Sequence, residues 1–197
     1  GGEGSSPLAG WGVYLRILLR RFRVQIVAWV LPLWLLVSIT APSYESVYPS
    51  LETRTVLIEQ MRKSPGTRLL YGYVPAPGRL GQLLQWETGT FLLVCTALMA
   101  ILLTCRMLRG DEDEGFVEVL RATGVGRIVL FLVPMALVWA VVGALSVGVG
   151  GILTWQTGSI EELTVSGAWA LAGTMCVAGW AFSAVAAVAS QLGRQVS

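Results

Sequence analysis

Four long stretches of the chain contain no Asp, Glu, Lys or Arg, and they limit its possible folds more than any other feature. A helix needs roughly 20 apolar residues to cross a hydrocarbon core of about 30 Å, and runs of about 18 residues meet that need with help from their flanks. We therefore expect an all-α fold, a polytopic membrane helix bundle with about four spans. The expected spans are residues 24–41, 88–105, 128–155 and 167–192.

The composition supports a membrane protein and removes other classes. Apolar residues make up 54% and charged residues 13% of the chain, and the mean hydropathy is +0.67, which does not suit a soluble domain. The formal charge is only +2 and the arginines cluster beside apolar runs, so nucleic acid is excluded as a partner. The chain has no histidine, and its cysteines lack zinc-site spacing, so we expect no metal site and no imidazole-based catalysis.

The segment before the first apolar run, residues 1–23, is basic and amphipathic. From Trp11 onward, apolar residues recur at helical spacing, while Arg16, Arg20 and Arg23 gather on the opposite side. Two interpretations remain open: a helix that lies in the membrane interface among anionic headgroups, or the arginine-rich cytoplasmic flank of the first span. The apolar side consists of Trp11, Tyr14, Leu15, Leu18, Leu19 and Phe22.

The segments between the spans are of two kinds. Residues 42–87 form a long polar segment in which Ser50 can cap a short helix through about Met61, whereas residues 106–127 form a compact charged loop. The positive-inside rule favours a cytoplasmic amino terminus in a bacterial cell membrane, with 42–87 outside and 106–127 inside. The basic residues placed inside are Arg16, Arg20, Arg21, Arg23, Arg106, Arg109, Arg121, Arg127 and Arg194.

The centres of the predicted spans carry no charged side chain, and their polar side chains are weakly polar ones. Proton-coupled carriers place ionisable groups there, so the energy for any transport must come from elsewhere. Thr96 and Met99, together with the apolar Leu103, are candidates to line a path for an apolar or amphiphilic cargo. Weakly polar groups such as Thr96 also hold helices together. Further candidates are Thr104, Ser146 and Ser183.

Small residues recur four positions apart in the third and fourth spans. This spacing lets helices approach each other closely in lipid, so we expect the spans to pack together in a bundle. The pairs are Ala144 and Gly148, Ser146 and Gly150, and the series Gly179, Ser183 and Ala187.

The charged loop predicts a capped helix of about three turns. Asp111 can cap its start, and Glu114 can reach back to the cap while acidic residues offset the positive end of the helix dipole. Phe116, Val119 and Leu120 form an apolar face that a solvated linker would not need, so the helix is expected to dock on a soluble partner. The whole candidate partner-binding set is Asp111, Glu112, Asp113, Glu114, Gly115, Phe116, Glu118, Val119, Leu120 and Arg121.

At this loop the sequence resembles the permeases of ATP-binding-cassette (ABC) exporters, particularly the branch linked to export of polyketide antibiotics and other drugs. The external segment around Tyr48 and Pro49, and later Leu70 to Gly72, is also similar to that family. Phe116 departs from the family, which often has a basic residue there, and Gly124 stands where proline is frequent. The shared loop features are Arg106 and Arg109, the acids 111–114, Gly115, the run 118–120 and the closing 125–127.

The resemblance implies a multidrug efflux permease whose loop is a coupling helix seated on an ABC ATPase subunit, present in two copies. The only lysine, Lys63, lies in no phosphate-binding loop, so ATP and Mg²⁺ are expected on that partner and this chain is not expected to be an enzyme. Because the family has about six spans in each of two units, we expect a second permease half or the remainder of a longer chain as a further partner, beside membrane lipid and a hydrophobic cargo.

Two other functions use some of the same features. A non-transporting membrane regulator would need the same external segment to sense and the same inner helix to report. A membrane-embedded enzyme could use the acids of residues 111–114 to bind a divalent metal, but a helix start explains those acids better.

Overall fold

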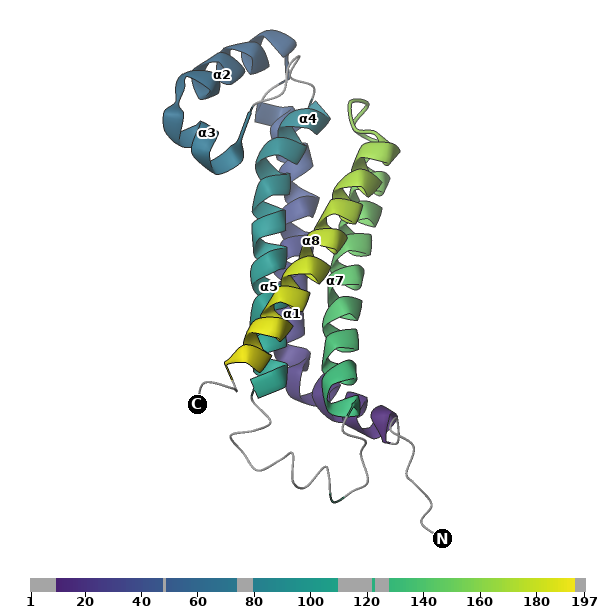
Figure 1. Cartoon of the computed structure of the whole chain (residues 1–197). Helices are drawn as coiled ribbons and strands as arrows, with labels where there is room; N and C mark the ends of the chain where they lie inside the picture. Colours follow the sequence, from purple (N-terminus) through teal and green to yellow (C-terminus); the bar gives the residue numbers. More distant parts are fainter. Residues whose placement is uncertain (1–9, 48, 74–79, 110–121, 123–127, 194–197) are drawn as a thin grey trace. The chain divides into compact units, whose positions relative to one another are not determined.

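The computed structural model describes residues 10–47, 49–73, 80–109, 122 and 128–193. Within these ranges all regular secondary structure is helical, and there is no strand. The elements are α1 (Trp11–Val47), α2 (Leu51–Lys63), α3 (Pro65–Tyr71), α4 (Leu80–Leu84), the π-helical turn η1 (Gln85–Gly89), α5 (Thr90–Arg109), α7 (Val129–Gln156) and α8 (Val165–Leu192) (Figure 1).

Four of these helical stretches are long and apolar enough to cross a membrane, which confirms the predicted all-α polytopic bundle. They run Trp11–Tyr44, Gln82–Leu108, Val129–Gln156 and Val165–Leu192. The first two are longer than the expected spans. The basic segment and the first span form one helix, and α4, η1 and α5 follow one another without a break.

The chain divides into two compact units. Unit 1 contains residues 1–29, 96–143 and 177–197, and unit 2 contains residues 30–95 and 144–176. Both units therefore take parts of the same four long helices.

The core of unit 1 is built from a stripe on each of its helices. Gly179 marks a close approach, because a Cβ atom there would lie 2.5 Å from Val142 Cγ1 and 3.0 Å from Thr96 Cγ2. At one end of α5, Arg106 Nη1 donates to Gln25 Oε1 at 3.2 Å. The buried residues of this unit include Tyr14, Leu18 and Phe22 of α1, Met99, Leu103 and Met107 of α5, and Val133, Val138 and Val142 of α7.

In unit 2 the small residues of α7 receive aromatic rings. A Cβ atom on Gly148 would lie 2.2 Å from Trp34 Nε1, and one on Gly150 would lie 2.9 Å from the Trp169 ring. The Trp34 indole also donates from Nε1 to the backbone oxygen of Leu145 at 3.1 Å. The spacing of small residues thus correctly predicted close packing, and here the group that approaches is a tryptophan ring.

Helix α1 continues through Pro42 to Val47, beyond the residue at which its span was expected to end. Proline has no N–H, so the carbonyl of Ser38, four residues earlier, loses its helical donor. The side chain of Gln156 replaces that donor, because its Nε2 donates to Ser38 O at 2.9 Å. A partner distant in sequence therefore satisfies the helix at its proline.

Helices α2 and α3 form a hairpin (Figure 1). The expected cap is confirmed: Ser50 accepts a hydrogen bond from the backbone N–H of Thr53, and α2 continues past Met61 to Lys63. Inside unit 2, an apolar cluster and an ion pair help to hold the hairpin. The apolar cluster consists of Ile58, Leu83 and Trp86, with Tyr44 and Met61 packed against it.

The ion pair is formed by Arg54 and Glu162. Arg54 is only 3% exposed, and its Nη1 donates to both carboxylate oxygens of Glu162, at 2.7 and 2.6 Å. Glu162 lies in the loop between α7 and α8, so the pair connects α2 to that loop. A buried guanidinium requires such a partner, because desolvating an unpaired charge is costly.

Candidate functional site

The basic segment of α1 has one face buried and one face exposed. Tyr14, Leu18 and Phe22 are buried in unit 1, while Trp11 remains 58% exposed. The expected cationic face is free of the core, since Arg16, Arg20 and Arg23 are all exposed. Part of the predicted apolar side thus packs on protein, and contact of the arginines with lipid headgroups stays a prediction.

The proposed cargo-path residues form a column on one side of α5. Thr96, Met99 and Leu103 are each fully buried, and Thr96 packs beside Gly179 of α8. Thr104 is also fully buried, as is Ser183. In this arrangement the column is part of the packed core of unit 1. A path along it would require the surrounding helices to separate, so the path stays a prediction.

The candidate coupling helix, Asp111–Arg121, lies outside the described residues. The helices on either side of it in the chain are described: α5 ends at Arg109 and α7 begins at Val129. Docking by this segment is therefore a prediction from the sequence.

Unit 1 also contains an apolar groove that the sequence analysis missed. Its volume is about 620 Å³, and it is lined by residues of α7 and α8. A signal was present in the sequence, because Phe131, Met135 and Trp139 recur every four residues along α7. From α8, the lining residues are Ala184, Ala187, Val188, Gln191 and Leu192.

Unit 2 contains a smaller hollow of about 210 Å³ with a mixed lining. Leu153 and Leu171 contribute apolar walls, and Glu162, Gln85 and Gln82 contribute polar ones. The Oε1 atom of Gln82 is buried there without a hydrogen-bond partner. Because Glu162 already binds Arg54, this hollow does not present a free carboxylate.

The chain matches no model of a known protein family. It is 33% identical over 180 residues to the multidrug efflux system permease protein Rv1217c of Mycobacterium tuberculosis (strain ATCC 25618 / H37Rv). The chain is a homologue of an efflux permease. The matched region covers 90% of this chain and 31% of that relative, so the chain spans about a third of the relative's length.

This homology confirms the family resemblance found in the sequence. Together with the four long apolar helices, it makes the chain a multi-pass membrane protein. Because the match reaches along nearly the whole chain, both units fall within the efflux permease similarity.

Proposed function

We propose that the chain is part of the membrane domain of an ABC exporter that moves apolar or amphiphilic compounds out of a bacterial cell. ATP would be hydrolysed with Mg²⁺ on separate ATPase subunits, two per transporter. The observation that carries this proposal is the similarity to a multidrug efflux permease along 90% of the chain.

The polar groups buried in the described spans support an external energy source. They are hydroxyls, namely Thr88, Thr96, Thr104, Ser146, Ser183 and Ser190. Hydroxyls do not change charge at physiological pH, and the partly buried Glu87 lies near the end of the Gln82–Leu108 stretch. The span centres therefore offer no proton relay of the kind that carboxylates and histidines form in coupled carriers. An ATPase that closes against the membrane domain is a suitable source of work for such a chain.

The segment Asp111–Thr123 is proposed as the coupling helix, on the cytoplasmic side together with the amino terminus. Its apolar face of Phe116, Val119 and Leu120 would enter a groove of the ATPase. Glu118 would lie on the polar rim of that contact. Truncation of a buried interface anchor typically costs on the order of 2 kcal/mol or more, so Phe116 is the residue to test first.

The test measures the ATPase retained on the purified assembly and the hydrolysis stimulated by cargo. Phe116→Ala is expected to weaken assembly. Glu118→Arg is expected to weaken it further, because reversing a charge at a docked rim adds repulsion. Glu161→Arg is the control, since Glu161 is an exposed residue of the α7–α8 loop on the other side of the membrane in this topology.

Two results would change the proposal. If both loop variants retain the ATPase as wild type does, the segment is not the coupling element. If the wild-type chain binds an ATPase but no compound stimulates hydrolysis or moves across the membrane, the chain acts as a regulator and not as an exporter.

A further inference from the structure

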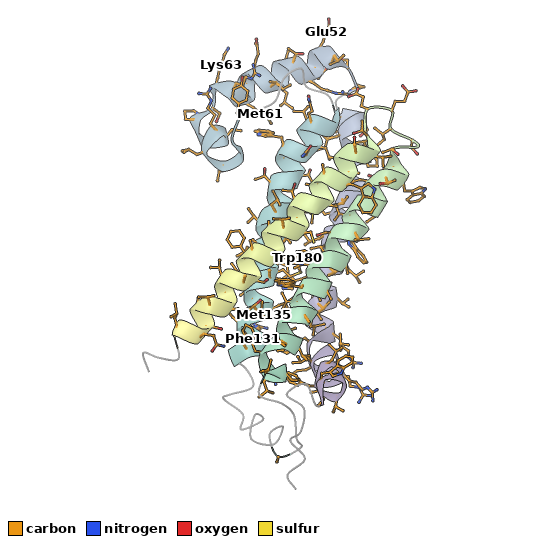
Figure 2. All side chains as sticks on the ribbon, turned by 45° about the vertical axis from the view of Figure 1, so that its right-hand side comes forward. Glu52, Met61, Lys63, Phe131, Met135 and Trp180 are labelled. Carbon is orange, nitrogen blue, oxygen red and sulfur yellow. The ribbon has the colours of Figure 1, made fainter. Side chains whose placement is uncertain are left out.

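The apolar groove of unit 1 has the size and composition of a small-molecule site. Small-molecule pockets have volumes of roughly 300–1,000 Å³, and the groove, at about 620 Å³, falls in that range. Phe131 and Met135 lie on the same stretch of α7 (Figure 2). The complete lining is Phe131, Leu132, Met135, Ala136, Trp139, Ala184, Ala187, Val188, Gln191 and Leu192.

One wall of the groove is the Trp139 ring, which is held in place by a second tryptophan, Trp180. The Trp139 and Trp180 rings stack, with centroids 5.2 Å apart and planes at 18°. Trp139 Nε1 donates to Ser183 Oγ at 2.8 Å, and Trp180 Nε1 donates to the Trp139 backbone oxygen at 3.2 Å. Both indole N–H groups are therefore satisfied inside the protein, and the ring of Trp139, 42% exposed, borders the groove in a set orientation.

The remaining lining selects against charge. Gln191 carries the single side-chain amide among the lining residues, and none of them is charged. A charged ligand group would lose its hydration here without gaining an oppositely charged partner, which is unfavourable. Met135 and Phe131 add polarisable surface next to the tryptophan, and sulfur and aromatic edges both favour contact with flat rings.

We propose that this groove binds neutral, apolar compounds that carry a flat aromatic part. The aromatic wall is what distinguishes such compounds from lipid, because an aliphatic acyl chain gains nothing from the preferred geometries of ring pairs. The assignment rests on the proposed export function, to which it adds the place of binding and the chemical class of the cargo.

The test uses benzophenone, a neutral aromatic ketone that attaches to nearby C–H groups on illumination. The assembly, reconstituted in lipid nanodiscs, is illuminated with benzophenone, and a parallel sample contains phosphatidylcholine with a diazirine in its acyl chain. Mass spectrometry then locates the labels. We expect benzophenone to attach to the peptides that contain Phe131–Trp139 and Ala184–Leu192.

Two variants and a control test the role of the wall. Ala184→Phe fills the groove from an exposed position on α8, and labelling there should fall about tenfold, equal to about 1.4 kcal/mol of binding free energy. Trp139→Leu keeps the wall apolar but removes its ring, so it should reduce benzophenone labelling and leave the acyl-chain label unchanged. Ala189→Phe, at an exposed position of α8 outside the lining, should change neither label.

The other outcomes overturn the assignment. Labelling of the groove by the acyl-chain probe alone would make it a lipid site, and labelling by neither probe would mean that another protein segment covers it. Equal benzophenone labelling in wild type and Ala184→Phe would also exclude it. These results are independent of the ATPase test: an absent ATPase refutes the exporter proposal, whereas the label map still decides what binds the groove.

Discussion

The two units use tryptophan in opposite ways. In unit 2 the Trp34 ring lies against the backbone of Gly148 and its N–H binds the carbonyl of Leu145. In unit 1 the Trp139 ring borders an open groove, and its N–H binds the hydroxyl of Ser183. The residue type is the same, but one ring closes a helix contact and the other forms a wall.

The difference comes from what faces each ring. Trp34 meets a glycine, which removes the side chain that would hold the helices apart, and its acceptor is a backbone atom. Trp139 is held by the Trp180 indole and by the Ser183 hydroxyl, both on α8. Its ring can therefore keep a fixed orientation while it borders the groove. Unit 2 therefore should tolerate added volume poorly at its ring, and unit 1 should tolerate it well.

The largest effect is expected at Gly148. A Cβ atom there would lie 2.2–2.5 Å from three atoms of the Trp34 indole, which is itself held by a hydrogen bond. Overpacking of this kind costs typically 1–3 kcal/mol, against a gain of up to about 1 kcal/mol from replacing glycine in a helix. Gly148→Ala should therefore lower stability by about 2 kcal/mol, measured by thermal unfolding of the purified assembly.

The matched control is Gly151→Ala, because nothing lies within 4 Å of a Cβ atom at that position of α7. It should be neutral or slightly stabilising. Adding Trp34→Ala should abolish most of the loss caused by Gly148→Ala, and a loss that remains in the double variant would show that the ring is not the obstacle.

A smaller effect is expected from Gln156→Leu, which removes the donor that replaces the missing N–H of Pro42. The carbonyl of Ser38 is then left unpaired, and we expect a loss of about 1 kcal/mol. In a Pro42→Ala background residue 42 regains an N–H, so the same substitution should cost less than half as much. Equal losses in the two backgrounds would separate Gln156 from the proline.

The smallest effect on stability is expected from Ala184→Phe in unit 1. The added ring would enter the groove and not the packed core, so the change should stay within about 0.5 kcal/mol. Comparison with Gly148→Ala in the same unfolding assay tests the contrast directly. A loss as large as that of Gly148→Ala would mean that the groove closes in the assembly.

The fold was predictable because a long stretch of sequence without charged residues strongly indicates a membrane-spanning helix. All four spans, the absence of charge at their centres and the Ser50 cap follow from local sequence. The end of α1 was not predictable, because Pro42 normally interrupts a helix and the group that compensates, Gln156, lies at the end of α7. Local reasoning cannot identify a donor that only the fold brings close.

The candidate site was less accessible to sequence reasoning. Thr96, Met99 and Leu103 were expected to line a path for an apolar or amphiphilic cargo, and the structure packs all three in the core. The groove was missed because the small residues of α8 that shape it look like helix-packing residues, such as Ala184 and Ala187. The structure shows that Ala184 and Ala187 line the groove together with Trp139, which their sequence spacing alone does not reveal.

An apolar cluster and an ion pair hold the hairpin of α2 and α3 against the rest of unit 2. Two contacts at separate points of an element restrict its rotation more than one contact does. If Glu162 released Arg54, the cluster around Ile58 would still hold the hairpin. The start of α8, which follows Glu162 closely, would then move without carrying the hairpin with it.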